Sequence, residues 1–445
     1  MKKRTQLRVN ILTSLGATLL STVVMAAAYP LYLHYLGYEQ YGIWLVLSTV
    51  ITMAQVGNLG ISPALIKLVA EDFSSGDIDG VYRYIGCGIL TLLSSGAVLV
   101  AAVLLFRRPI VSAFGIGHGS ADLVFRLLPW VGALSVYLLI CDALNSVLAG
   151  LGRYDLVSYS QVLGQLITVG SAVVLFQHHY GVWSLLIANL LDAIFIHAVS
   201  VFFIRRIAGR NILAHVRFEK QRLQRLLDFG SWVFGASILN TVIYPLNRVF
   251  ITRYAGVAAV PIYDISLATA FKIRSFFESG FRSLTPEFSR VQAARPIEAQ
   301  GYLAAADHKG LKVVVFLGTP VYLVVFAVCG FGLKLWLGAR FTPEIPQIFR
   351  VLLIGTYLGL WGLQPWYSLL GFGRSRDILG SNAIQALAGL TYIIAAPRSL
   401  ETVAIGTSLG MLASTLYLRV QASKLRSGFS GFRKRHPCVF NHFPG

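Results

Sequence analysis

Long apolar segments recur along the whole of this 445-residue chain and limit its fold more than any other feature. Each is long enough to cross the roughly 30 Å hydrocarbon core of a bilayer. They lie at about 9–33, 41–69, 84–106, 122–149, 157–177, 180–204, 227–252, 258–284, 311–338, 347–370, 379–396 and 401–420. Runs of this length are too long for barrel strands, and lipid offers no hydrogen-bond partner to an open backbone. The sequence therefore predicts an all-α membrane protein with about twelve transmembrane helices.

Composition agrees with this prediction. Hydrophobic residues make up 56% of the chain, charged residues only 13%, and the mean hydropathy is +0.67. A soluble core of this length could not bury so much apolar side chain.

Two motifs recur about 220 residues apart and indicate an internal duplication. Leu-Ala-Gly-Leu-Gly-Arg at 148–153 matches Leu-Leu-Gly-Phe-Gly-Arg at 369–374, and Tyr-Leu-Gly at 35–37 matches Tyr-Ala-Gly at 254–256. We expect two pseudo-symmetric six-helix bundles, at 1–204 and 227–422. A basic cytoplasmic linker, 205–226, joins them, and a basic cytoplasmic tail, 423–445, follows. Paired bundles of this kind form a central cavity whose access alternates as the halves rock.

Positive charge predicts the orientation. The net charge is +19, and Lys and Arg concentrate in the N-terminal segment, the linker and the tail, whereas the loops on the other side hold few. The positive-inside rule then places both termini in the cytoplasm. Anionic membrane lipids account for the basic surface. Nucleic acid is not expected as a partner because no soluble region is large enough to form a recognition module.

The eighth apolar segment is unusual because it carries Asp264, Lys272, Arg274, Glu278 and Arg282. Charges cost several kcal/mol in lipid, so these groups must face protein or water. The last three lie four residues apart and so share one helix face. They either pair with one another and fix helix packing, or they line a hydrated cationic cavity for an anionic head group.

On the second interpretation, the substrate-binding cations are Arg274, Arg282, Lys272 and, in the seventh segment, Arg248. Asp142, in the fourth segment, is a candidate for coupling transport to H+ or Na+, as are Asp264 and Glu278. A carboxyl group satisfied by packing is the alternative for Asp142. Trp361, Trp366 and Tyr367 surround Pro365 and are candidates for stacking on sugars, although membrane tryptophans also serve as interfacial anchors. No cofactor or metal site is expected, since His436, Cys438 and His442 lack ligand spacing.

Several segments resemble one family. Asn10 to Gly37, Tyr41-Gly42-Ile43-Trp44 and Asn58-Leu59-Gly60-Ile61 are similar to the start of the polysaccharide-biosynthesis flippases of the Wzx, or O-antigen, type in the MOP (MATE-like) superfamily. The resemblance extends through the two Gly-x-Gly-Arg turns. It implies a protein of the bacterial inner membrane that flips a polyprenyl-diphosphate-linked oligosaccharide to the periplasmic leaflet, coupled to an ion gradient and working with polysaccharide-assembly machinery. Relatives often carry Asp where this chain has Asn58, so no carboxylate role is assigned there.

Two other classes of function remain open. A MATE-type multidrug antiporter would share the bundle, but cationic drugs would favour an acidic cavity. A membrane glycosyltransferase or polymerase would need a sizeable outer loop with acid or base residues, and the outer loops offer only scattered groups such as Glu39, Glu344 and Glu401. We therefore expect a transporter rather than an enzyme.

Overall fold

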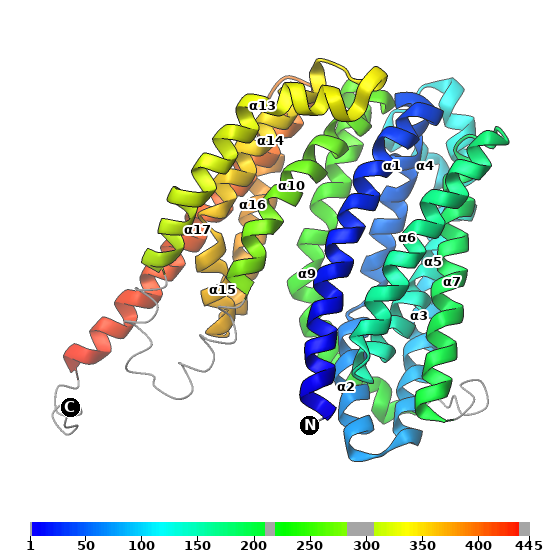
Figure 1. Ribbon diagram of the computed structural model, residues 1–445, viewed down its shortest axis with the longest axis vertical. Coiled ribbons are helices and arrows are strands. Elements are labelled where there is room, and N and C mark those ends of the chain that lie inside the picture. The colour runs from blue at the N-terminus through cyan, green and yellow to red at the C-terminus, as the bar shows by residue number, and fades with distance from the viewer. Residues whose placement is uncertain (1, 210–218, 283–306, 436–445) are drawn as a thin grey trace. The chain divides into compact units, whose positions relative to one another are not determined.

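The computed structural model describes residues 2–209, 219–282 and 307–435, and within these ranges it contains helices and no strands (Figure 1). The all-α fold expected from the apolar segments is confirmed. The chain divides into two compact units, Met1–Pro261 (unit 1) and Ile262–Gly445 (unit 2). The expected division into bundles at 1–204 and 227–422 stays a prediction.

Unit 1 is a bundle built mainly around three long helices. α5 (His118–Gly150) and α6 (Tyr154–Gln177) both pack against α1 (Lys2–Ala54), as Figure 1 shows. The remaining helices of this unit are α2 (Ile61–Ser75), α3 (Ile78–Leu105), α4 (Arg107–Phe114), α7 (Trp183–Ala208) and α9 (Lys220–Ala255). α9 packs on α1 and α2, and Gly60 and Gly230 allow the closest approach, because a Cβ at Gly60 would lie 2.0 Å from the Gly230 carbonyl oxygen.

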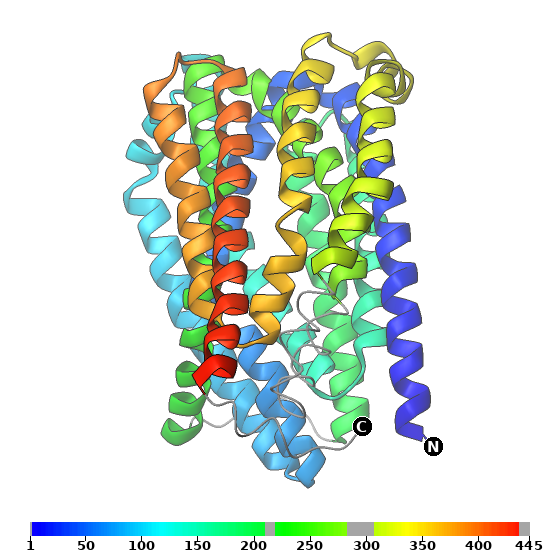
Figure 2. The same cartoon turned by 90° about the vertical axis from the view of Figure 1, so that its left-hand side faces the viewer.

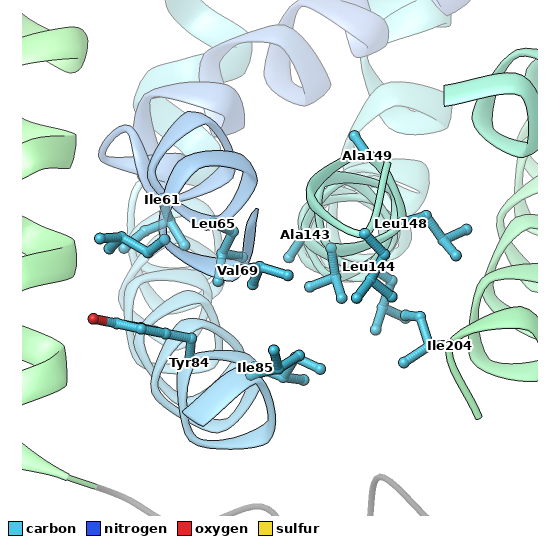
Figure 3. Close-up of a cluster of buried hydrophobic side chains, with 14 of the residues drawn as sticks. Ile61, Leu65, Val69, Tyr84, Ile85, Ala143, Leu144, Leu148, Ala149 and Ile204 are labelled. Carbon is cyan, nitrogen blue, oxygen red and sulfur yellow. The ribbon is translucent and has the colours of Figure 1, made fainter. Parts of the chain in front are cut away.

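The apolar core of unit 1 lies between α2, α3, α5 and α7 (Figure 3). Ile61, Leu65 and Val69 of α2 recur every four residues, so they share one face. Figure 3 shows that face turned towards Ala143 and Leu144 of α5. In lipid, such contacts stabilise the bundle through close packing, since lipid tails are as apolar as the side chains.

Unit 2 contains α10 (Val260–Arg282), a helical span Asp307–Arg340 that includes α13 (Thr319–Leu337), α14 (Glu344–Leu360), α15 (Leu363–Gly371), α16 (Ser375–Ala395) and α17 (Leu400–Arg435). α17 packs along α16 and α14, and Figure 2 shows α16 and α17 side by side. Small residues permit this approach. A Cβ at Gly389 would lie 3.0 Å from the Gly406 carbonyl oxygen, and one at Gly355 would lie 2.4 Å from the Ser408 hydroxyl.

The two recurring motifs adopt matching backbones, which supports the duplication. Gly37 (φ 67°, ψ −177°) and Gly256 (φ 84°, ψ 166°) take up the same conformation, one that favours glycine. Gly152 (φ 81°) and Gly373 (φ 70°) each follow a helix end. The hydrogen bonds around them also match, since Arg153 N donates to Leu148 O and Arg374 N donates to Leu369 O.

The second expected span, 41–69, is interrupted, so the prediction of one continuous segment was wrong there. α1 ends at Ala54, a 3-10 turn (Gln55–Asn58) follows, and Leu59 and Gly60 have positive φ values of 50° and 75°. Asn58 closes this break by capping α2. Its Oδ1 accepts from Ser62 N at 3.0 Å, and its Nδ2 donates to Ser62 Oγ at 2.8 Å.

In the described ranges, eight helices are long and apolar enough to cross a membrane, or nine if α14 and α15, which meet at a 43° bend, form one broken span. α9 and α10 are not among the eight, and α10 is the helix that carries the charged segment. The linker expected at 205–226 is helical at both ends, because α7 continues to Ala208 and α9 begins at Lys220. Residues 210–218, between them, lie outside the described residues.

Candidate functional site

Unit 1 contains a polar cavity of about 660 Å³ between α1, α2, α5, α6 and α7. Six hydroxyl side chains, Ser14, Thr18, Ser21, Ser62, Ser146 and Ser158, line it, together with Asn145, Gln161, Gln165, Tyr154 and the carboxylates Asp142 and Asp192. Among the lining residues that the structure describes there is no Lys, Arg or His. We call this space the unit 1 cavity.

Many polar groups of the unit 1 cavity are satisfied by neighbouring helices. The hydroxyls of Ser14 and Ser158 are 3.1 Å apart, and Ser200 Oγ donates to Asn145 Oδ1 at 3.0 Å. Two buried acceptors differ, because Gln165 Oε1 and Asp192 Oδ1 have no hydrogen-bond partner among the described residues. A buried acceptor without a donor costs free energy, so these atoms are suited to a donor that enters the cavity.

The structure places Asp142, which the sequence analysis singled out, in the wall of the unit 1 cavity, with the Gln55 side chain close to its carboxyl group. Asp192 of α7 lines the same cavity and was not assigned a role from the sequence. Gly164 lets α6 approach it, since a Cβ there would lie 2.0 Å from Asp192 Oδ1. An ionisable residue in the apolar segment 180–204 was the available signal for Asp192.

Arg248, expected to bind substrate, lies half-buried on α9 against α1. Its Nη1 donates to Leu45 O at 3.1 Å and to Ser48 Oγ at 2.9 Å. These bonds connect the two helices within unit 1. Substrate binding by Arg248 stays a prediction.

In unit 2, the half-buried Arg274 lies against the backbone of α14. A Cβ at Gly359 would be 3.2 Å from its Nη1, so glycine permits the contact. The guanidinium lies 5.8 Å from the centre of the Phe271 ring, and its Nε has no hydrogen-bond partner among the described residues. Arg274 therefore places a positive charge with an unused Nε donor at the contact between α10 and α14.

A chain of aromatic rings runs through the same unit. The ring centres of Tyr322 and Tyr357 are 5.4 Å apart, and those of Tyr357 and Trp361 are 6.3 Å apart. The Arg419 guanidinium lies 5.6 Å from the centre of the Trp361 ring. Arg419 was not singled out from the sequence, although a cation inside an apolar segment is the same signal that drew attention to Arg274.

The other candidates in unit 2 have varied surroundings. Tyr367 is buried and its hydroxyl donates to Glu278 Oε1 at 2.8 Å, while Trp366 packs against Leu369, Ile378 and Leu418. Lys272 is exposed and Asp264 is buried, both on α10. Arg282 ends α10, and its side chain is outside the described set, as are His436, Cys438 and His442. The roles assigned to these residues stay predictions.

The part of the chain that the structure describes contains no group of three or more His, Cys, Asp or Glu residues that could hold a metal ion. The candidate sites present hydroxyls, amides, carboxylates, arginines and aromatic rings. Such groups recognise polar and anionic molecules.

Comparison with known proteins identifies the family. A family model described as a polysaccharide biosynthesis protein matches residues 35–346. A Shigella flexneri protein named "Putative O-antigen transporter" is 22% identical over 395 residues, which cover 86% of this chain and 90% of the relative.

Solved structures show the same fold. A multidrug resistance MATE family transporter of the MOP superfamily, in an inward-facing conformation, is 15% identical with a TM-score of 0.71, over 92% of this chain and 95% of that one. A Vibrio cholerae MATE transporter is 16% identical with a TM-score of 0.64, over 96% and 97%. The expected multi-pass fold is thus confirmed, and the relatives are transporters rather than enzymes, as expected. With a family model that matches residues 35–346, the chain belongs to the polysaccharide biosynthesis protein family.

Proposed function

We propose that this protein moves a polyprenyl-diphosphate-linked oligosaccharide from the cytoplasmic to the periplasmic leaflet of the bacterial inner membrane. Such a molecule cannot cross hydrocarbon alone, because its phosphates and hydroxyls would lose water without compensation. A polar path through the helices removes that barrier while the polyprenyl tail stays in lipid. Access alternates as the two halves rock, and no covalent bond is made or broken.

The observation that carries this proposal is the environment of Arg274. Its Nε lacks a partner among the described residues, and Gly359 exposes the backbone of α14 to its guanidinium. A guanidinium in low-dielectric surroundings forms strong, often bidentate, hydrogen bonds to phosphate oxygens. Arg274 therefore binds the diphosphate, and Arg248, Lys272 and Arg282 are the further cations that attract it.

Ion coupling is the second part of the proposal. Asp142 and Asp192 line the unit 1 cavity, and Asp264 and Glu278 lie on α10. A carboxylate in the membrane binds H+ or Na+ readily because the ion removes the cost of its buried charge. Loading and release of such an ion then bias the rocking of the halves.

The family supports the substrate class. Its description is a polysaccharide biosynthesis protein, and the Shigella flexneri relative is named for O-antigen. Lipid-linked oligosaccharides are intermediates of such polysaccharides, so polysaccharide-assembly machinery is the expected partner. Both termini then lie in the cytoplasm, as the distribution of Lys and Arg predicts.

One observation favours a second candidate, the export of cationic drugs. The solved relatives include multidrug resistance transporters, and the described lining of the unit 1 cavity has carboxylates and no cation. Drug pockets, however, are lined mainly by apolar side chains with a few polar groups. The many hydroxyls and amides of this cavity fit that pattern poorly.

Deletion of the gene separates the two candidates. We expect the deletion strain to accumulate lipid-linked oligosaccharide on the cytoplasmic side, to lose surface polysaccharide and to keep its normal sensitivity to cationic dyes. Re-expression of the wild-type chain should reverse both defects. Increased dye sensitivity with intact surface polysaccharide would overturn the proposed function in favour of drug export.

A further inference from the structure

We infer that the unit 1 cavity is a subsite for uncharged sugar rings, distinct from the Arg274 surroundings in unit 2. This inference deepens the proposed function and rests on it for the biological substrate. It assigns to a set of residues on α1, α2, α5, α6 and α7 the task of holding part of the glycan. The sequence had suggested Trp361, Trp366 and Tyr367 for that task.

The charge of the cavity is unfavourable for a diphosphate. Two carboxylates, Asp142 and Asp192, line it, and the described lining residues include no Lys, Arg or His. A diphosphate would be repelled by these carboxylates and would find no cation to offset the cost of its desolvation. The ligand of this cavity is therefore not the diphosphate.

The polar side chains of the cavity have hydrogen-bonding capacity that a sugar can use. Gln165 Oε1 and Asp192 Oδ1 are buried acceptors that lack a donor among the described residues. Gln161 and Ser62 add further polar groups to the lining of the cavity. Sugar hydroxyls both donate and accept, so a sugar satisfies unpaired acceptors and amides alike.

The ring of Tyr154 is placed to stack on a sugar. This residue begins α6, lines the cavity and is 44% exposed. An aromatic ring offers an apolar face to the C–H side of a sugar ring while its hydroxyl stays available for hydrogen bonds. Trp361, in contrast, already contacts Tyr357 and Arg419, and Trp366 packs into an apolar cluster.

The volume of the cavity suits a ligand of a few sugar rings. The cavity volume of about 660 Å³ lies within the roughly 300–1,000 Å³ typical of small-molecule sites. That volume suits a short stretch of glycan and is too small for a long polymer. The subsite is therefore expected to hold only part of a longer chain.

Binding of simple sugars to the purified full-length chain in lipid nanodiscs tests the subsite. The probes are glucose, galactose and N-acetylglucosamine, and the readout is saturation-transfer difference NMR. We expect at least one sugar to bind. Gln165→Leu and Tyr154→Ala should weaken that binding about fivefold to tenfold, as the loss of one hydrogen bond or one ring contact would.

Matched variants control for folding. Tyr154→Phe keeps the ring and should retain most of the binding. Tyr159→Ala removes a tyrosine from the same helix that is 53% exposed and does not line the cavity, so it should bind like the wild type. Each variant is first checked for a monodisperse elution profile. Because Gln165→Leu and Tyr154→Ala act on separate contacts, failure of one to fold leaves the other as the test.

Two results would overturn the subsite. One is the absence of binding by all three sugars. The other is saturable binding of the lipophilic cation tetraphenylphosphonium in place of sugar. Such binding would have to be lost on substitution of Tyr154 or Asp142. Neither result tests whether the substrate is lipid-linked. The deletion strain tests that separately. Sugar binding in a protein whose deletion leaves oligosaccharide export intact would instead reject the proposed function and keep the subsite.

Discussion

Arg274 is the residue at which the proposed function is most directly testable. We expect Arg274→Gln to lower export at least about tenfold, since a charge-assisted hydrogen bond contributes roughly 1.5–3 kcal/mol. Protein abundance should stay near the wild-type level. Arg274→Lys should restore export only in part, because an ammonium lacks the planar fork of the guanidinium. Lipid-linked oligosaccharide in the cytoplasmic leaflet, measured against membrane abundance, provides the readout.

The matched control for Arg274 is Arg376→Gln, at an exposed position on α16 of the same unit. It removes an equal charge away from the α10 face and should leave export unchanged. The competing interpretation is that Arg274 and Glu278 only fix helix packing. In that case Arg274→Gln would lower abundance, and exchanging the two residues would recover it.

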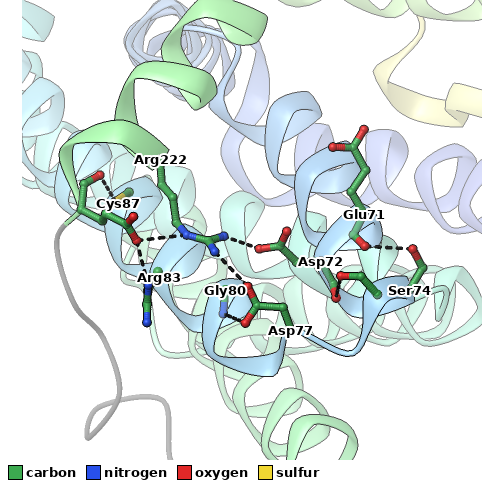
Figure 4. Close-up of polar contacts among 10 residues, drawn as sticks. Glu71, Asp72, Ser74, Asp77, Gly80, Arg83, Cys87 and Arg222 are labelled. Atoms are coloured by element: carbon green, nitrogen blue, oxygen red, sulfur yellow. Dashed lines mark hydrogen bonds and ion pairs between the residues drawn. The ribbon is translucent and has the colours of Figure 1, made fainter.

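At the scale of elements, Arg222 connects the start of α9 to the turn between α2 and α3 (Figure 4). Its guanidinium bonds to Asp72, to Asp77 Oδ2 at 2.9 Å and to Glu219 Oε2 at 3.1 Å. It also lies 4.8 Å from the centre of the Tyr84 ring. Removing one arginine therefore leaves three neighbouring carboxylates without their shared cation.

We expect Arg222→Ala to destabilise the protein by about 2 kcal/mol, the scale of hydrogen bonds to charged groups. The melting temperature of the purified chain should fall accordingly. Arg225→Ala, at an exposed position one turn later on α9, is the control and should have little effect. Equal melting temperatures for the two variants would show that the Arg222 contacts add nothing to stability.

The same contacts predict a dependence on pH. The Gly80 N–H donates to Asp77 at 2.8 Å and, together with Arg222, lowers the pKa of Asp77 below its usual 3.8. A carboxyl group whose pKa is lower in the folded than in the unfolded protein stabilises the folded state. This stabilisation is complete above the pKa of the unfolded state and is lost as the pH falls through the pKa of the folded state. The free energy of unfolding should thus decline below about pH 4. In the Asp77→Asn variant it should decline less steeply.

The helices and the glycine turns were predictable because their signals are local. The length of an apolar segment predicts a membrane helix. Gly37, Gly152, Gly256 and Gly373 mark turns with positive φ, a conformation that glycine adopts without steric cost. The break at Leu59 was not predictable, because a positive φ at leucine leaves no pattern in the sequence. The unit 1 cavity was also hidden. Its Ser and Gln residues are individually ordinary, and only folding brings them together from four helices.

At the scale of the whole molecule, the two units offer different chemistry. Unit 1 has a cavity of hydroxyls, amides and carboxylates, and unit 2 has an arginine and a chain of aromatic rings. The substrate that we propose combines neutral sugars with an anionic diphosphate, so it would use both kinds of surface. A single uniform pocket would have to repel and attract the diphosphate at once.

The orientation that the charge distribution predicts is testable with one cysteine at a time. Glu401 and Ser423 are exposed near opposite ends of α17, and at 1.5 Å per residue their separation is roughly 33 Å, enough to cross the bilayer. In unit 1, the exposed Glu39 and Ser75 flank the second expected span. Cysteines at 39 and 401 should react with a membrane-impermeant thiol reagent in intact cells, whereas those at 75 and 423 should react only after lysis.

The native cysteines permit this experiment. Cys87, Cys141 and Cys329 are buried, so they should stay unlabelled, and Cys438 can be replaced by Ser. Each pair reports on its own unit, so the result does not depend on how the units are arranged. Because the positive-inside rule acts on the cytoplasmic loops, both pairs must agree. Labelling of 75 and 423 in intact cells, with 39 and 401 protected, would place the termini outside and reverse the proposed direction of transport.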